Sequence, residues 1–189
     1  MDAIPDFEDL LLLLHKHEVR YLVIGGLAFI YHARPRYTKD MDLWIDPSPR
    51  NVRRANAAVA EFGSPYLLDV AEPEEILQLG LPPNPIDFRR AVPGPPFGQA
   101  WKRRIKGKYG RSDVNWIDLD SLIDVKSRVD DPRHRRDVRD PSPDGRRGWL
   151  HRTRLLEAQE FPPGPGKKQV VSRSIGPRGR DGPVLAARE

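Results

Sequence analysis

The stretch YLVIGGLAFIYHARPRYTKDMDLWID, residues 21–46, contains the clearest structural signals of this chain. Its short apolar run, Leu22–Ile24, predicts a buried strand. Two adjacent glycines end that run, because they give the backbone the freedom that a tight turn needs. The apolar segment Leu27–Ala33 then predicts a helix that starts directly after the turn. The stretch therefore predicts a strand, a glycine turn and a helix ahead of its acidic end.

The acidic end predicts a second strand, over residues 40–46, in which polar and apolar residues alternate. Asp40 and Asp42 stand two residues apart and project from one face, with Cβ atoms about 6–7 Å apart. Ionised carboxylates repel each other and prefer water, so a bound divalent cation would remove the cost of placing them together. Mg²⁺ takes such oxygens as ligands. The pair therefore indicates a magnesium site, and the alternative is a solvated strand face.

A third carboxylate and a phosphate-binding turn fit the same site. Asp87 lies between two apolar residues of the candidate strand Ile86–Phe88. It therefore faces away from them and is the best candidate to complete a two-metal arrangement. Gly25 and Gly26 have no Cβ and precede a helix whose free N–H groups attract phosphate. The alternative for the glycines is an ordinary turn.

The composition indicates a folded domain with an irregular part. The chain has 189 residues, of which 38% are hydrophobic, with 20 prolines and 15 glycines. The absence of cysteine excludes disulfides, thiolate metal sites and cysteine nucleophiles. The apolar runs Leu10–Leu14 and Tyr21–Tyr31 are shorter than the roughly 20 residues that cross a bilayer. With an acidic N-terminus and no secretory signal, we expect a cytoplasmic protein without a membrane partner.

Charge is unevenly distributed along the chain. Residues 1–88 carry 8 basic and 14 acidic side chains, whereas residues 89–136 carry 13 and 6, within a total net charge of +5. This division favours a cation site and an anion site in one fold, and a solvated mixed surface with a basic tail is the alternative. An RNA partner is plausible because Trp101, Tyr109 and Trp116 interrupt the basic segment and can stack on bases, although such residues more often pack in a core.

The remaining patterns predict an α/β (α+β) fold, a mixed sheet flanked by helices. Expected helices run from an N-cap at Asp6 to about His17, from Ser48–Pro49 to Gly63, and over residues 73–79, 97–104 and, capped by Asp118, 119–129. Further expected strands are residues 66–70, 86–88 and one or two within 108–117. We expect one domain over residues 1–140, a short helical extension over 141–161 and a disordered basic tail rich in proline and glycine over 162–189.

The order Gly25-Gly26, Asp40-Met41-Asp42, Asp87 resembles the signature of the nucleotidyltransferase superfamily, which has the DNA polymerase β-like fold. More narrowly, GGLAFIYHARPRYTKDMDLWI is similar to small prokaryotic nucleotidyltransferases related to abortive-infection toxins, in which an Arg-x-Thr element lies between the glycines and the aspartates. The similarity continues through IDF, FGQAWKRR and LIDVKSRVDDPRHRRDV to about Asp140, some three quarters of the chain. Arg89 and Arg90 depart from it, as does the irregular C-terminal part.

The resemblance implies roles for individual residues. Mg²⁺, as two ions, with Mn²⁺ as an alternative, would be bound by Asp40, Asp42 and Asp87, and Asp87 would help to deprotonate an attacking hydroxyl. The nucleotide would be bound by Gly25, Gly26, Arg36, Thr38, Lys126 and Asp137. For Lys126 the alternative is an exposed helix lysine, and for Asp137 it is a surface pair with Arg133 or Arg136.

The resemblance further implies transfer of a nucleoside monophosphate from a nucleoside triphosphate, such as ATP, to a hydroxyl. The acceptor would be RNA, tRNA included, or a protein, and a toxin–antitoxin or phage-defence role with a partner antitoxin protein is implied by the resemblance alone. One alternative is a catalytically decayed binding module for nucleic acid or a partner protein. A metal-dependent phosphohydrolase is a third hypothesis, disfavoured by the few histidines.

Overall fold

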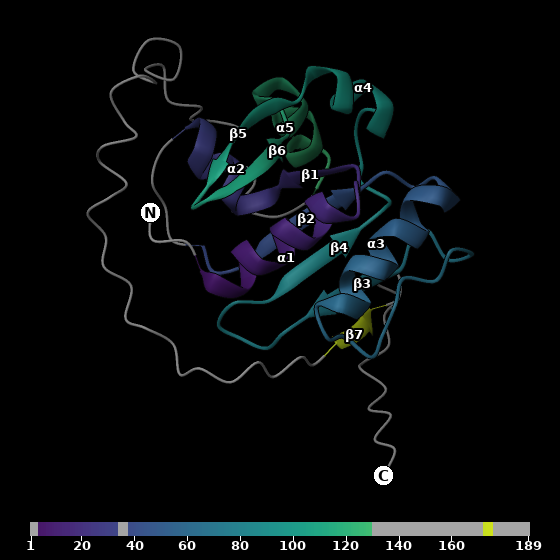
Figure 1. The fold of residues 1–189 in the computed structure, drawn as a ribbon. Coiled ribbons are helices and arrows are strands. Elements are labelled where there is room, and N and C mark those ends of the chain that lie inside the picture. Colours follow the sequence, from purple (N-terminus) through teal and green to yellow (C-terminus); the bar gives the residue numbers. More distant parts are fainter. Residues whose placement is uncertain (1–3, 34–37, 130–171, 176–189) are drawn as a thin grey trace.

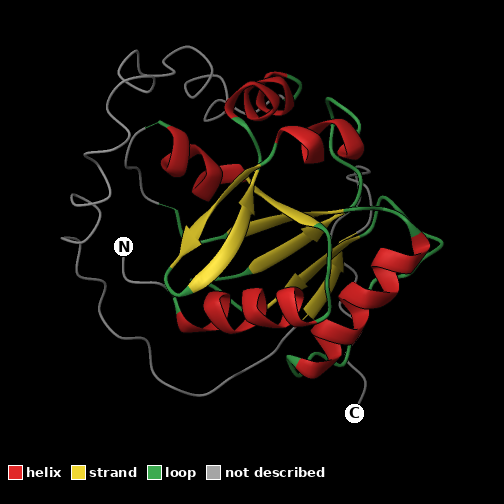
Figure 2. Cartoon of the chain, turned by 45° about the horizontal axis from the view of Figure 1, so that its top comes forward, coloured by secondary structure: helices red, strands yellow, loops and turns green. Residues whose placement is uncertain are grey.

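The computed structural model of this chain describes residues 4–33, 38–129 and 172–175. Six strands between residues 21 and 116, and a seventh at residues 172–175, form one mixed sheet in the order β5-β6-β1-β2-β4-β3-β7. Helices lie on both faces of this sheet (Figures 1 and 2). The predicted class, a mixed sheet flanked by helices, is therefore confirmed.

The elements of the described chain alternate between helix and strand in its first half. The helices are α1 (Pro5–Lys16), α2 (Gly25–His32), α3 (Pro49–Glu61), α4 (Phe97–Arg103) and α5 (Leu119–Ser127). The strands are β1 (Tyr21–Ile24), β2 (Met41–Ile45), β3 (Ile76–Leu79), β4 (Ile86–Arg89), β5 (Ile105–Tyr109), β6 (Ser112–Trp116) and β7 (Ser172–Ile175).

The centre of the sheet is set by β2, which pairs antiparallel with β1 and parallel with β4. One face of these strands is apolar, with Met41, Leu43 and Phe88 fully buried. Helices α1 and α3 cover this face (Figure 2). Side chains alternate between the faces of a strand, so the residues between these core positions are directed to the opposite face.

The opposite face is covered by α2, α4 and α5 (Figure 2). At the end of β2, Trp44 is buried against Phe97 of α4, with the two rings perpendicular and their centroids 5.3 Å apart. The predicted strand over residues 40–46 is thus half-buried only near its start. Further along, helix α4 and its aromatic side chains exclude water.

Two predicted elements between α3 and β4 are wrong. Residues 66–70, expected as a strand, form an irregular loop that the Asn56 side chain holds through the backbone N–H and C=O of Leu68. Residues 73–79, expected as a helix, end in strand β3. Leu77 and Leu79 are buried at alternate positions and pair with Phe88 and Ile86 of β4. The proline at position 73 suggested a helix start, but the two-residue apolar period of the strand decides the conformation.

Helix ends follow the prediction in part. Helix α1 begins after Ile4 without a side-chain cap, so the predicted N-cap at Asp6 is wrong and Asp6 lies in the first turn instead. Asp118 caps α5 as predicted, because its carboxylate accepts a hydrogen bond of 3.1 Å from the backbone N–H of Ser121. Gly63 follows α3 with a φ of 102°, which accounts for the predicted stop.

The C-terminal half adds an antiparallel hairpin, β5–β6, where one or two strands were predicted. Strand β7 pairs antiparallel with β3, a contact that the sequence did not predict. The expected extension over residues 141–161 lies outside the described residues, as does the expected disordered tail apart from β7. Within residues 4–33, 38–129 and 172–175, no helix is both long enough and apolar enough to span a bilayer.

Candidate functional site

Two of the predicted site aspartates are cross-strand neighbours. In the parallel pair β2–β4, Asp42 is in register with Asp87. Adjacent strands lie about 4.8 Å apart, and residues in register project from the same face. The carboxylates of Asp42 and Asp87 therefore lie side by side on the face opposite the apolar core, as predicted for Asp87.

A positive side chain bridges these two carboxylates. Arg89 donates from Nε to Asp42 Oδ1 at 3.3 Å and from Nη2 to Asp87 Oδ2 at 2.9 Å. The side chains of Asp42 and Asp87 are 16% and 14% exposed, whereas that of Arg89 is 33% exposed. The pair is thus largely enclosed and partly neutralised by an arginine that water can reach.

Two further residues position the carboxylates. Gln78 of β3 is in register with Asp87 and donates from Nε2 to Asp87 Oδ1 at 2.8 Å. Gly25, with a φ of 67°, lies against Asp42, because a Cβ at this position would stand 2.0 Å from Asp42 Oδ2. The glycine turn and the acidic strand are therefore in direct contact, as a shared phosphate and metal site requires.

The third predicted carboxylate, Asp40, lies just before β2 and is exposed. Its carboxylate accepts a hydrogen bond from the Thr38 hydroxyl. Asp40 is also close enough to raise the pKa of Asp42 by charge repulsion. Asp40 therefore belongs to the same acidic group, at its solvent side.

The electrostatics of the site centre on Asp42. Burial, as the largest cause, raises the pKa of its carboxyl to about 6, and the charges of Asp40 and Asp87 act in the same direction. The charge and hydrogen bond of Arg89 oppose this rise without cancelling it. The single guanidinium of Arg89 therefore does not neutralise the acidic group completely.

The remaining predicted site residues have different positions. Gly26 is buried in the first turn of α2. Lys126 of α5 is buried, with Nζ 5.6 Å from the ring centroid of Phe29 in α2, so the alternative of an exposed lysine is wrong. Arg36 and Asp137 lie outside the described residues.

The aromatic residues proposed to stack on RNA are mostly structural. Tyr109 and Trp116 are 5% and 3% exposed, so the prediction that they stack on bases is wrong. Trp101 is partly buried, and the guanidinium of Arg104 lies 3.9 Å from its ring centroid. Its other neighbours are Phe97, stacked at 5.8 Å, and Arg20 at 4.9 Å.

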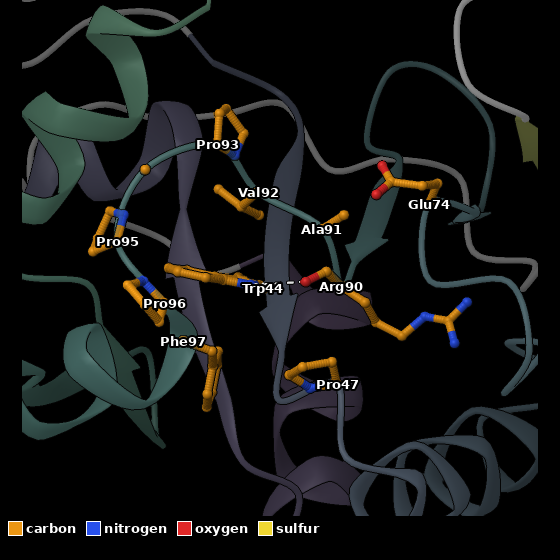
Figure 3. A pocket seen from close by; sticks show the side chains of 11 residues that line it. Trp44, Pro47, Glu74, Arg90, Ala91, Val92, Pro93, Pro95, Pro96 and Phe97 are labelled. Atoms are coloured by element: carbon orange, nitrogen blue, oxygen red, sulfur yellow. Dashed lines mark hydrogen bonds between the residues drawn. The ribbon is translucent and has the colours of Figure 1, made fainter.

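A separate cavity of about 540 Å³ lies beyond the C-terminal ends of β2 and β4 (Figure 3). Its walls include Trp44, whose indole N–H donates to the backbone carbonyl of Arg90 at 3.1 Å. The proline-rich segment 91–97 forms much of the rest. No predicted site residue lines this cavity, so its chemistry is distinct from that of the acidic group.

The acidic group fits a hard divalent cation by the chemistry of its donors. Asp40, Asp42 and Asp87 carry three negative charges against one positive charge from Arg89, and all three offer carboxylate oxygens. In the described part of the chain, no three histidine or acidic side chains are already arranged to hold a metal ion. A cation would therefore use carboxylates that now contact Arg89 and Thr38.

Sequence reasoning missed two contributors to the site, Arg89 and Gln78. Arg89 was noted as a departure from the resemblance, but its two ion pairs were not predicted. The signal was its position two residues after Asp87 on a strand, which places both side chains on one face. Gln78 was hidden by the wrong helix prediction for residues 73–79.

No protein-family model matches this chain, and no curated protein matches it.

Proposed function

We propose that this chain is a Mg²⁺-dependent nucleotidyltransferase: an acceptor hydroxyl attacks the α-phosphate of a nucleoside triphosphate, the nucleoside monophosphate is transferred to that hydroxyl, and pyrophosphate leaves. The observation that carries the proposal is the register of Asp42 with Asp87, beside a glycine turn that lies directly against Asp42. A polyphosphate is favoured by a divalent cation and by the N–H groups of a helix N-terminus. This arrangement supports both at one place.

The acidic residues have separate roles in this proposal. Asp40 and Asp42, with Asp87, would hold the cations, which when bound would supply charge neutralisation for the attacking and leaving oxygens. Asp87 accepts the proton of the acceptor hydroxyl, and Gln78 holds its carboxylate in position through a 2.8 Å hydrogen bond. Catalysis then depends mainly on positioning and electrostatics.

The phosphate end of the substrate is assigned to the turn at Gly25 and the N-terminus of α2. A side chain on Gly25 would collide with Asp42, so only glycine lets the turn and the carboxylate approach so closely. Lys126 packs over Phe29 of that same helix and supports a positive environment on this side of the sheet. Thr38 is assigned to the nucleotide site through its contact with Asp40.

The acceptor is assigned to the basic region that follows β4. Lys102, Lys106 and Lys108 are exposed on α4 and β5. Exposed cations attract phosphate backbones, which favours RNA, tRNA included, over a protein hydroxyl. A role in a toxin–antitoxin or phage-defence system, with an antitoxin protein as partner, is part of this proposal through the resemblance alone.

The test is transfer of label from nucleoside triphosphates to total RNA or protein in the presence of Mg²⁺. Asp42→Asn and Asp87→Asn are expected to lose transfer, whereas Glu61→Gln, at an exposed carboxylate of α3 that pairs with Lys16 and His17, keeps it. Circular dichroism establishes that each variant is folded. Transfer by Asp42→Asn at the wild-type rate would contradict the proposal.

A second candidate function is a binding module that has lost catalysis. The specific observation in its favour is Arg89, which already neutralises part of the charge that a cation would satisfy. Thermal stabilisation by a nucleoside triphosphate with Mg²⁺, lost on adding EDTA, favours the enzyme. RNA binding that is indifferent to both additions favours the module.

A further inference from the structure

Arg89 makes the same kind of contact with the acidic pair that a bound cation would make. Its guanidinium reaches Asp42 Oδ1 and Asp87 Oδ2, one oxygen from each of two strands. Arginine presents several N–H donors in a rigid plane, which suits it to bridge carboxylates. The bridge is therefore a specific ion pair across β2 and β4.

The other oxygens of the pair are constrained by neighbouring groups. Gln78 donates to Asp87 Oδ1, and Gly25 lies against Asp42 Oδ2. A hard cation that uses both aspartates must therefore approach oxygens that already pair with Arg89 or displace another neighbour. Arg89 can move away, because its side chain is 33% exposed and water can solvate its charge.

The backbone keeps Arg89 at this place. Arg89 lies two residues after Asp87 on β4 and is in register with Trp44, two residues after Asp42 on β2. Both cross-strand pairs belong to one continuous ladder. Arg89 can therefore pair with the carboxylates again, after a cation has left, without any rearrangement of the backbone. The backbone thus keeps the Arg89 side chain within reach of the two carboxylates.

We propose that Arg89 is a built-in counter-cation that competes with divalent metal ions for Asp42 and Asp87 and so weakens metal binding. This inference deepens the proposed function and rests on it, because it concerns the metal site that the function requires. A guanidinium and a divalent ion are both attracted to the same two carboxylates and repel each other. Removal of the arginine charge therefore leaves the metal without a competitor.

The test measures Mn²⁺ binding to the full chain, from the electron paramagnetic resonance signal of free Mn²⁺ at pH 7.5. Arg89→Met is expected to bind Mn²⁺ at least about tenfold more tightly than the wild type, which corresponds to about 1.4 kcal/mol. Arg89→Lys keeps the charge and is expected to remain near the wild-type affinity. Arg54→Met is the matched control, because Arg54 pairs with an exposed carboxylate of Glu18 elsewhere on the surface.

Two further variants make the result decisive. Arg89→Gln removes the charge with a polar side chain and replaces Arg89→Met if that variant does not fold by circular dichroism. The double variant Arg89→Met with Asp42→Asn is expected to lose the gained affinity, which assigns the bound ion to the acidic pair. Equal or weaker Mn²⁺ binding by the charge-removing variants, or no detectable binding by any variant, would overturn the proposal.

This outcome can be separated from that of the proposed function. Tighter Mn²⁺ binding by Arg89→Met without transfer of label in any variant would support the competition and contradict the nucleotidyltransferase. Transfer of label by the wild type, together with unchanged Mn²⁺ binding in Arg89→Met, would support the nucleotidyltransferase and contradict the competition.

Discussion

Consecutive arginines at the end of β4 have contrasting surroundings. Arg89 is one-third exposed and pairs with the carboxylates of Asp42 and Asp87. Arg90 is 1% exposed in its side chain and donates to the backbone carbonyls of Asp69 and Glu72 in the loop before β3. The first arginine thus belongs to a charged group near water, and the second holds a loop to the sheet.

The difference shows that charge alone does not identify a functional arginine. The guanidinium of Arg90 is buried, so its N–H groups need acceptors within the protein, and two loop carbonyls supply them. The carboxylates of Asp42 and Asp87 do not require a partner from the protein in this way, because water would solvate them fully if the site were open. A region that keeps partly enclosed carboxylates next to an exposed cation is therefore a better candidate for ligand binding than a region that buries its cation.

The largest expected effect is that of Arg90→Met on stability. The substitution removes the donor of two loop carbonyls and the buried cation near Glu75, so we expect the free energy of unfolding to fall by about 3–5 kcal/mol. Urea unfolding followed by circular dichroism measures it. Arg54→Met, at an exposed pair, is the control and is expected to change stability by less than about 1 kcal/mol. The contrast between the arginines fails if Arg89→Met destabilises as much as Arg90→Met.

The next effect is the pH dependence that Asp42 imposes. The pKa of Asp42 is raised from 3.8 to about 6, so the folded state binds this proton more tightly than the unfolded state does. The stability contributed by the protonated form is present below the unfolded pKa and is lost as the pH rises through about 6. A rise of this size in the pKa corresponds to about 3 kcal/mol. The free energy of unfolding of Asp42→Asn, relative to that of the wild type, should therefore increase by about 3 kcal/mol as the pH rises from about 3.5 to about 7.

Urea unfolding of both proteins across this pH range measures the gain. Glu8→Gln is a control of opposite sign, because hydrogen bonds from Arg111 lower the pKa of Glu8. The stability contributed by ionised Glu8 is present above its unfolded pKa and is lost as the pH falls through the folded value. A difference between Asp42→Asn and wild type that stays constant with pH would show that Asp42 is not desolvated.

The fold was predictable where one signal dominated. The alternation near Asp42 and the glycine pair identified β1, α2 and β2, since period and turn chemistry agree there. The segment between α3 and β4 failed because local signals conflicted. A proline favoured a helix at residues 73–79, whereas the pairing of Leu77 with Phe88 of β4 imposes a strand. The alternation of Leu77 and Leu79 is a local strand signal, but it spans only four residues and becomes decisive through this long-range pairing.

The site was predictable in its acidic members and not in their partners. The spacing of Asp40 and Asp42 and the apolar flanks of Asp87 give their faces directly. That Asp42 and Asp87 stand in register depends on β2 and β4 being adjacent and parallel, which follows from the topology of the whole sheet. The bridge by Arg89 depends on the same register, so it became visible only with the structure.

A smaller effect is expected from Gly25→Ala. Its φ of 67° costs an alanine about 1–2 kcal/mol, and the new Cβ would also stand 2.0 Å from Asp42 Oδ2. Gly63→Ala is the matched control, since Gly63 also has a positive φ but has no neighbouring atom within 4 Å of the place that a Cβ would take. We expect Gly25→Ala to be the more destabilising of the two in urea. Equal losses would show that the turn does not press on the carboxylate.

The smallest expected effect concerns Gln78, which tests how much the contacts around Asp87 contribute to stability. Gln78→Ala removes one hydrogen bond to a carboxylate that is 14% exposed, so water can replace part of the lost donor and the expected cost is about 1 kcal/mol. A double-mutant cycle with Asp87→Asn in urea isolates the pairwise contribution. Contacts at the acidic group should stabilise the fold far less than those of Arg90, because water reaches the acidic group and can replace a lost partner there, whereas Arg90 is buried. A Gln78→Ala cost as large as that of Arg90→Met would remove the basis for distinguishing the two regions.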